Sequence, residues 1–189
     1  TDAPTALQRM VPDYTASLQA GTEGACEDGA CEPEHEVQAS TDFAQCARSG
    51  AKDCGTLPAI GASEWLNSLG EPHGTVTLVD FWSSSCVNCA REIPEIERIY
   101  EKYKDAGLVV IGVHSPQQAH EREASVVSGA ASRLGITYPV ALDPELEAFQ
   151  AYGANAWPTH YLAGPDGQLR SMGRGTSGLE EQIRTLLTE

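Results

Sequence analysis

Two cysteines three positions apart, Cys86 and Cys89, are the residues whose type and spacing most directly allow chemistry. They lie in the stretch VDFWSSSCVNCAREIP, after an apolar run and at the start of a segment with helical spacing. Free amides and the positive dipole end of a helix stabilise a thiolate, which is the nucleophile of disulfide exchange. The spacing therefore predicts a redox pair: a partly exposed Cys86 attacks a partner disulfide, and a buried Cys89 resolves the mixed disulfide.

Two other interpretations of this pair are a structural cross-link and a metal site. A three-residue offset at a helix start closes a small, easily reduced ring, which makes a poor cross-link. A metal site needs further ligands, and His114 is a possible third. A copper-binding or metallochaperone module using Cys86, Cys89 and His114 stays open as the alternative function, and so does a peroxidase that uses Cys86 alone.

The elements that must position the pair follow a strand, helix, strand order. The run TVTLVDFW, residues 75–82, is rich in β-branched and aromatic residues and predicts a buried strand. A helix is expected over 92–107, where apolar residues recur at helical spacing before a glycine, and a second apolar strand over 108–114. Such a unit forms a right-handed parallel crossover.

The remaining elements complete an α/β domain. Helices are expected over 118–134 and 144–152, with a short extended segment at 136–140 between them. The turn signal Pro165-Asp166-Gly167 predicts a hairpin, followed by a last helix near the C-terminus. These elements predict a central sheet of mixed parallel and antiparallel strands, about four or five in number, with helices on both faces.

Composition excludes several classes of partner. The formal net charge is −15 and the pI about 4.6. Binding to a nucleic acid or an anionic lipid surface needs a basic patch, and the twelve Lys and Arg residues are scattered. Apolar runs are all too short for a membrane span, so we expect no direct membrane insertion by this chain.

A change in composition near Leu57-Pro58 predicts two domains, 1–58 and 59–189. The first part carries ten acids against three bases, a balance of −7, and few large apolar residues. It cannot bury enough surface to fold alone, so we expect an acidic, irregular tether.

Four more cysteines lie in this first part: Cys26, Cys31, Cys46 and Cys54. In an oxidising compartment we expect them to form structural disulfides. Three pairings are possible, of which the local one, 26 with 31 and 46 with 54, is the simplest. A soft-metal site formed by Cys26, Cys31 and His35 is the open alternative.

The motif LVDFWSSSCVNC resembles the active-site strand and turn of the thioredoxin superfamily. Together with GASEWLNS, YKDAGLVVIGVHSP, LGITYPVALD and WPTHYL it resembles the membrane-linked DipZ/TlpA-type thiol–disulfide oxidoreductases. The resemblance implies a thioredoxin-like fold and an enzyme that reduces protein disulfides with no cofactor beyond its own redox-active disulfide. It also implies a CcdA-type membrane electron donor and an extracytoplasmic location, on the periplasmic or cell-envelope side, with a membrane tether of a longer protein as one option.

The same resemblance suggests further site residues. Asp80 corresponds to a buried carboxylate near the resolving cysteine and, if buried, can relay the proton of Cys89. Glu92 corresponds to an acid that tunes the cysteine pair in this family. It is equally well explained as a negative charge that is favourable near the N-terminus of a helix. A cis-proline is expected at Pro158, where an X-Pro bond makes the cis form accessible. The expected substrate-binding residues are Trp82, Val87, Asn88, Trp157, Pro158 and Thr159.

Overall fold

The computed structural model describes residues 34–50, 53–67 and 75–188, and the side chains from residue 42 onward. The compact unit that contains the sheet runs from His35 to Glu189. Its helices are α2 (Glu34–Ser49), α3 (Val87–Tyr103), α4 (Ala124–Leu134), α5 (Glu147–Ala151) and α6 (Leu179–Leu186), with 3-10 turns η2 (Lys104–Ala106) and η3 (Ala119–Arg122). Its strands are β1 (Trp65–Leu66), β2 (Val76–Trp82), β3 (Leu108–His114), β4 (Val140–Leu142), β5 (Thr159–Ala163) and β6 (Leu169–Gly173).

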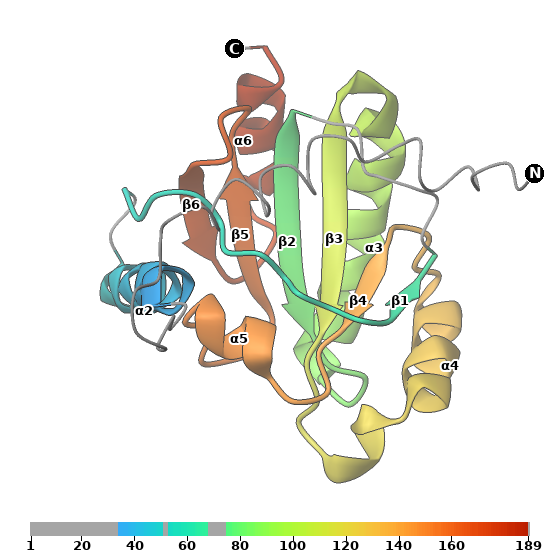
Figure 1. Cartoon of the computed structure of the whole chain (residues 1–189). Helices are drawn as coiled ribbons and strands as arrows, with labels where there is room; N and C mark the ends of the chain where they lie inside the picture. Colours follow the sequence, from blue (N-terminus) through green and yellow to red (C-terminus); the bar gives the residue numbers. More distant parts are fainter. Residues whose placement is uncertain (1–33, 51–52, 68–74, 189) are drawn as a thin grey trace, which may run out of the picture. The chain divides into compact units, whose positions relative to one another are not determined.

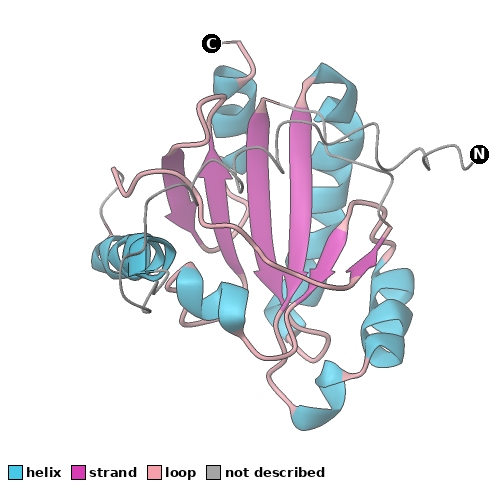
Figure 2. Cartoon of the chain, in the orientation of Figure 1, coloured by secondary structure: helices cyan, strands magenta, loops and turns pink. Residues whose placement is uncertain are grey.

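The strands form one mixed sheet in the order β1-β4-β3-β2-β5-β6. The central strand β2 pairs with β3 in parallel and with β5 in antiparallel orientation, and both pairings keep their register along the strand. Figure 2 shows the strands side by side with helices around them. The predicted fold class and the predicted parallel crossover, β2-α3-β3, are therefore confirmed, although the sheet has six strands where about four or five were expected.

Two apolar clusters cover the two faces of this sheet. In Figure 1, α3 lies behind the strands and α5 in front of them. The face behind packs Leu78 and Trp82 against Ile93 and Ile96 of α3 and against the apolar sides of α4 and α6. The front face packs Phe81 of β2, together with the side chains of β3 and β5 that point to the same face, against α2 and α5. Because successive strand residues point to opposite faces, the register decides which side chains meet α3.

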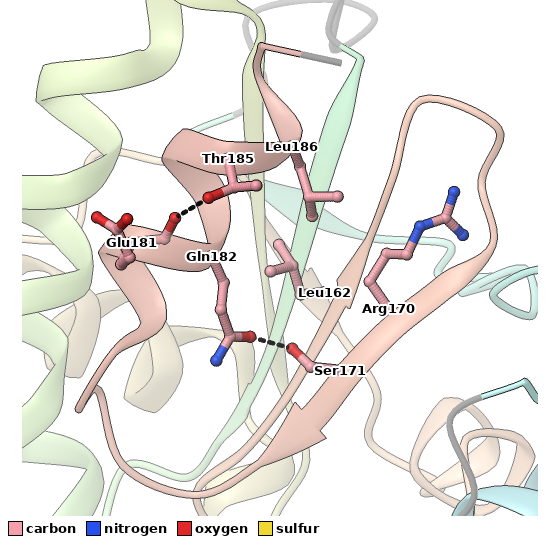
Figure 3. Close-up of a pocket in the computed structure, with 7 residues that line it drawn as sticks. All are labelled: Leu162, Arg170, Ser171, Glu181, Gln182, Thr185 and Leu186. Atoms are coloured by element: carbon pink, nitrogen blue, oxygen red, sulfur yellow. Dashed lines mark hydrogen bonds between the residues drawn. The ribbon is translucent and has the colours of Figure 1, made fainter.

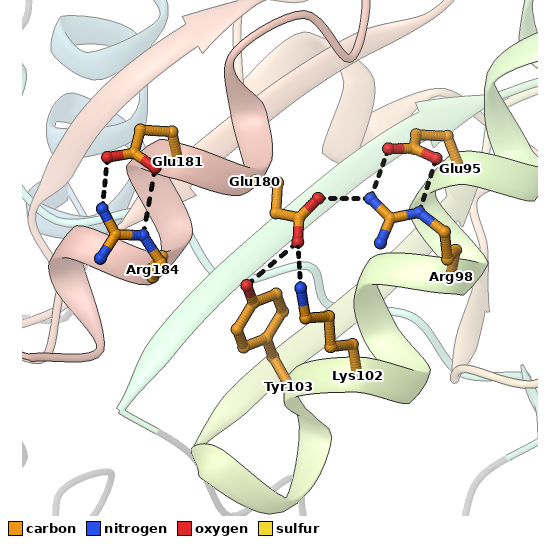
Figure 4. A network of polar contacts seen from close by, with 7 residues as sticks. All are labelled: Glu95, Arg98, Lys102, Tyr103, Glu180, Glu181 and Arg184. Carbon is orange, nitrogen blue, oxygen red and sulfur yellow. Dashed lines mark hydrogen bonds and ion pairs between the residues drawn. The ribbon is translucent and has the colours of Figure 1, made fainter.

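Polar contacts also connect α6 to α3, the helix that carries Cys89. Glu180 accepts hydrogen bonds from Arg98, Lys102 and Tyr103, as Figure 4 shows. These contacts lower the pKa of Glu180 to about 2. The pairs are exposed, so each adds little to stability. They lie beside the buried apolar cluster that already packs α6 and α3 together.

Residues 42–58 differ from the expected irregular tether. The sixteen-residue helix α2 was not predicted, and it places Phe43, Ala44 and Ala47 in the core. The Phe43 ring meets the Tyr152 ring edge-on at 5.8 Å. A Cβ atom at Gly153 would clash with the backbone of Ala44, so α2 depends on a glycine for its close approach. The compact unit thus begins well before the expected boundary at residue 58; residues 1–33 lie outside the described part, and their role as a tether stays a prediction.

Of the four N-terminal cysteines, Cys46 and Cys54 form a disulfide, as in the simplest predicted pairing. It connects α2 to the segment that continues toward β1. Cys26 and Cys31 lie outside the described residues, and so does the side chain of His35.

We expect Phe43→Ala to lower the free energy of unfolding by about 3 kcal/mol, because it removes a buried aromatic ring and leaves a cavity. The control is Asp42→Ala on the exposed side of the same helix, expected to change stability by less than about 0.5 kcal/mol. Urea denaturation measures both. Equal effects of the two substitutions would contradict the docking of α2.

Candidate active site

The disulfide between Cys86 and Cys89 lies at the junction of β2 and α3, where the sequence predicts it. Cys86 is the N-cap residue of α3, and its Sγ accepts a hydrogen bond from the amide of Cys89 at 3.1 Å. In this disulfide form, Cys86 is 8% exposed and Cys89 1%. Cys86 is therefore the more exposed of the two cysteines, although less exposed than expected.

A buried acid holds the turn that leads from β2 to Cys86. Glu121 of η3 is fully buried, and its Oε2 accepts hydrogen bonds from the Ser83 hydroxyl at 2.7 Å and the Gln117 amide at 2.8 Å. Burial by itself raises the pKa of Glu121, but hydrogen bonds, including one from Ser85, outweigh it and lower that pKa. Glu121 could not be identified from the sequence, because an acid in a polar loop gives no signal of burial.

His114, considered above as a metal ligand, is engaged in the same turn. It ends β3, is 1% exposed, and its Nε2 accepts a hydrogen bond from the Ser84 amide at 3.1 Å. Only the neutral imidazole can accept this bond. Burial is the main cause that lowers the pKa of His114 to about 4.

We expect His114 to make the protein acid-sensitive. Its pKa is about 4 when folded and about 6.5 when unfolded, so its contribution is complete above pH 6.5 and is lost as the pH falls toward 4. This difference corresponds to about 3 kcal/mol. Urea denaturation across this range should show a smaller loss for His114→Gln, whose amide oxygen can accept the Ser84 bond but does not titrate. An equal loss in both proteins would assign the acid sensitivity to other groups.

The predicted substrate-binding residues fall into an exposed and a covered group. Val87 is 63% exposed, and Asn88 is also exposed beside the disulfide. The Trp157-Pro158 bond is cis, as predicted, and the half-buried Trp157 ring stacks on a phenylalanine of α5 at 4.4 Å. Thr159 is buried, and its hydroxyl donates to the backbone oxygen of Ala156 at 2.7 Å. Val87, Asn88 and Trp157 are therefore the side chains of this set that reach the surface.

Trp82 differs from its expected place on the substrate surface, since it is fully buried. It points to the α3 face, and its ring meets the His114 ring edge-on at 4.8 Å. The room for it comes from Gly112, where a Cβ atom would lie 2.9 Å from the Tyr138 ring and 3.2 Å from Trp82 Nε1. In the disulfide form, Trp82 supports the turn from within.

The two predicted acids, Asp80 and Glu92, meet at a residue that the sequence analysis missed. Asp80 is fully buried on β2, and Glu92 lies one helical turn after Cys89 on α3. The imidazole of His160 lies between them, with Nδ1 3.0 Å from Asp80 Oδ1 and Nε2 3.0 Å from Glu92 Oε2. His160 follows the cis-proline by two residues, a position to which no motif in the sequence analysis assigned chemistry.

Two cavities lie on the same side of the sheet as these residues. One of about 400 Å³ lies between β5, β6 and α6, as Figure 3 shows, and includes neither cysteine. A smaller one of about 200 Å³ is lined by His160, Arg174 and residues of β6 and α6. The His160 imidazole, which contacts Asp80, therefore borders this cavity.

The model of the AhpC/TSA family matches residues 61–172, which include β2, both cysteines and the cis-proline. The chain belongs to the AhpC/TSA family. Its thioredoxin-like fold is shared with a thioredoxin-like protein solved in the oxidised form, at a TM-score of 0.63 and 27% identity over 71% of this chain and 95% of that one. The predicted thioredoxin-superfamily resemblance is confirmed.

Two relatives are similar to this chain at the level of sequence, and the name of the second states the predicted class of activity. Protein DipZ of Mycobacterium tuberculosis is 39% identical over the whole of this chain, which spans 29% of the DipZ length. Thiol-disulfide oxidoreductase YkuV of Bacillus subtilis is 30% identical over 68% of this chain and 91% of YkuV. The predicted enzyme class, a thiol–disulfide oxidoreductase of the thioredoxin superfamily, is confirmed at this level.

Within the described ranges, no group of three or more His, Cys, Asp or Glu side chains is placed to hold a metal ion. No helix in the same part of the chain has the length and apolar character needed to cross a membrane.

Proposed function

We propose that this chain reduces disulfides of other proteins outside the cytoplasm, with Cys86 as the attacking nucleophile and Cys89 as the resolving residue. The observation that carries the proposal is the disulfide at the start of α3, in which Cys86 is both the N-cap and the more exposed of the two cysteines. After reduction, the Cys89 amide and the helix dipole stabilise a thiolate at Cys86. The second cysteine sits one turn away, where it can displace the substrate sulfur.

The proposed substrate is a polypeptide that contains a disulfide. The surface around Cys86 supports this choice, because the exposed Val87 and the half-buried Trp157 offer apolar contacts and Asn88 offers hydrogen bonds. Pro158 and Thr159 supply the adjoining backbone, which can pair with an extended substrate chain. Close packing around a small ligand is not needed for such a partner.

For the electron donor we propose a CcdA-type membrane domain. This chain corresponds to 29% of the DipZ proteins, so most of their length is available for other parts. The Cys46–Cys54 disulfide supports an extracytoplasmic location, since structural disulfides persist in oxidising compartments. Two electrons passed to the Cys86–Cys89 disulfide would restore the dithiol after each turnover.

The function is tested by the reduction of insulin with dithiothreitol as the electron source. The protein should accelerate precipitation of the reduced chains well above the rate of dithiothreitol alone. Equilibration with dithiothreitol buffers then gives the reduction potential of the pair, which sets the direction of electron flow. A wild-type protein that gives no acceleration, with its cysteines shown to be reduced, would refute the proposed function.

A further inference from the structure

The register of the sheet sets Asp80 opposite His160. They are paired positions on the antiparallel neighbours β2 and β5, which Figure 1 shows side by side. Leu78 and Trp82 flank Asp80 in the alternating pattern and face α3, and Leu162 beyond His160 faces it too. Both polar side chains therefore lie on the face that α3 and Cys89 cover.

Each nitrogen of the His160 imidazole faces a carboxylate. Nδ1 lies 3.0 Å from Asp80 Oδ1, and Nε2 lies 3.0 Å from Glu92 Oε2. A neutral imidazole has one N–H donor and can serve only one of the two acids. The doubly protonated ring places a positive charge beside both acids, so this geometry favours the imidazolium.

The exposure of the three side chains falls in order from the helix surface inward. Glu92 is 22% exposed, His160 5% and Asp80 1%. Asp80 and His160 Nδ1 have no well-aligned hydrogen bond among the described residues, so their contact is an ion pair rather than a directed bond. A buried carboxylate without hydrogen bonds depends on a nearby positive charge to remain ionised.

The charged groups around His160 come from few elements. The strand β2 contributes Asp80, α3 contributes Glu92 with Cys89 one turn before it, and the loop after β6 contributes the exposed Arg174 at the rim of the smaller cavity. The other residues that line this cavity are uncharged. Of these basic side chains, His160 is therefore the one that is buried and lies in direct contact with Asp80.

We propose that His160 is the positioning residue of the resolving step: its imidazolium, held between Asp80 and Glu92, keeps Asp80 ionised so that Asp80 accepts the proton of Cys89. This inference rests on the proposed function. In the step, the Cys89 thiol gives its proton to Asp80, and its sulfur attacks Cys86 Sγ. The bond between Cys86 and the substrate breaks, the substrate leaves as a thiolate that takes a proton from water, and the Cys86–Cys89 disulfide forms. The two enzyme thiols are oxidised, and the substrate disulfide is reduced to two thiols.

The electrostatics agree with the geometry. Burial lowers the pKa of His160, but the contacts with Asp80 and then with Glu92 outweigh it and raise that pKa to about 8. The ring is accordingly charged at neutral pH. Loss of the charge leaves Asp80 buried without a cation, which favours a protonated Asp80 that cannot act as a base.

The test follows both chemical steps with an aromatic disulfide that releases one coloured thiolate at each. The first release reports attack by Cys86, and the second reports resolution by Cys89. For His160→Gln we expect the pH midpoint of the second step to rise by about one to three pH units, as for removal of an adjacent opposite charge. At pH 7 the second step should slow by about tenfold or more, while the first step is unchanged.

Two variants separate charge from structure. His160→Lys restores a cation and should move the midpoint back toward that of wild type. His120→Gln changes an exposed histidine outside the acid pair and should leave both steps unchanged. An unaltered second-step profile in His160→Gln would overturn the proposal.

A direct measurement on the wild-type protein covers the case in which the variants fold poorly. Nitrogen chemical shifts of the oxidised protein should show both nitrogens of His160 protonated at pH 7, with deprotonation near pH 8. A neutral His160 ring at pH 7 would refute the counter-ion role even if the protein reduces insulin. Failure to reduce insulin with a charged His160 would instead refute the proposed function.

Discussion

Replacement of Cys86 by serine is expected to reduce insulin reduction to the rate of dithiothreitol alone. A serine hydroxyl at the start of α3 cannot exchange with a disulfide, so the first step is lost. Cys89→Ser should have a different result: the first step proceeds, and the substrate remains bound to Cys86 as a mixed disulfide. Non-reducing electrophoresis and mass spectrometry detect this adduct.

The matched control removes the other described disulfide. The double substitution of Cys46 and Cys54 by serine should lower stability by about 2 kcal/mol, because it opens a short loop, and should leave the reductase rate unchanged at a temperature where the protein stays folded. An adduct on Cys89 in the Cys86→Ser protein, with none on Cys86 in Cys89→Ser, would reverse the assigned roles.

Much of the active site could be predicted from the sequence because its signals are local. Cys86 and Cys89 lie within one stretch, and the apolar run before them and the helical spacing after them directly indicate a strand-to-helix junction. The proline at 158 belongs to a recognisable motif as well. Each of these features depends on a few neighbouring residues.

The depth and direction of the side chains could not be predicted in the same way. The strand β2 is apolar along nearly its whole length, because it is buried on both faces, so the sequence has no alternation that shows where Trp82 points. The helix α2 was missed because its three core residues occur in an acidic, polar segment that suggested a solvated chain. Its burial depends on Tyr152 and Gly153, more than a hundred residues away.

The contact between Asp80 and His160 is the clearest case of this limit. It joins residues on strands that are far apart in the sequence and depends on the antiparallel register of β2 and β5. A one-residue shift of that register would turn His160 to the opposite face and away from α3. Identifying Asp80 as a buried acid was possible from the motif, whereas its counter-ion required the pairing.

Asp80→Asn is expected to slow the resolving step by about 100-fold at neutral pH, because the amide cannot take the proton of Cys89, and general-base catalysis contributes about that factor or more. The side chain keeps nearly the same size, so the packing of β2 against α3 should remain. Rapid-mixing measurement of the second thiolate release gives the rate, with Asp105→Asn, an exposed acid in η2, as the control.

A double-mutant cycle shows whether Asp80 and His160 act together. If His160 works only by keeping Asp80 ionised, His160→Gln should slow the resolving step in the wild-type background and have little further effect in Asp80→Asn. Independent action of the two residues would make the two losses multiply. A wild-type rate in Asp80→Asn would remove Asp80 from the mechanism, and since Glu92 contacts His160 on the outer side, Glu92→Gln would then show whether that acid serves as the base instead.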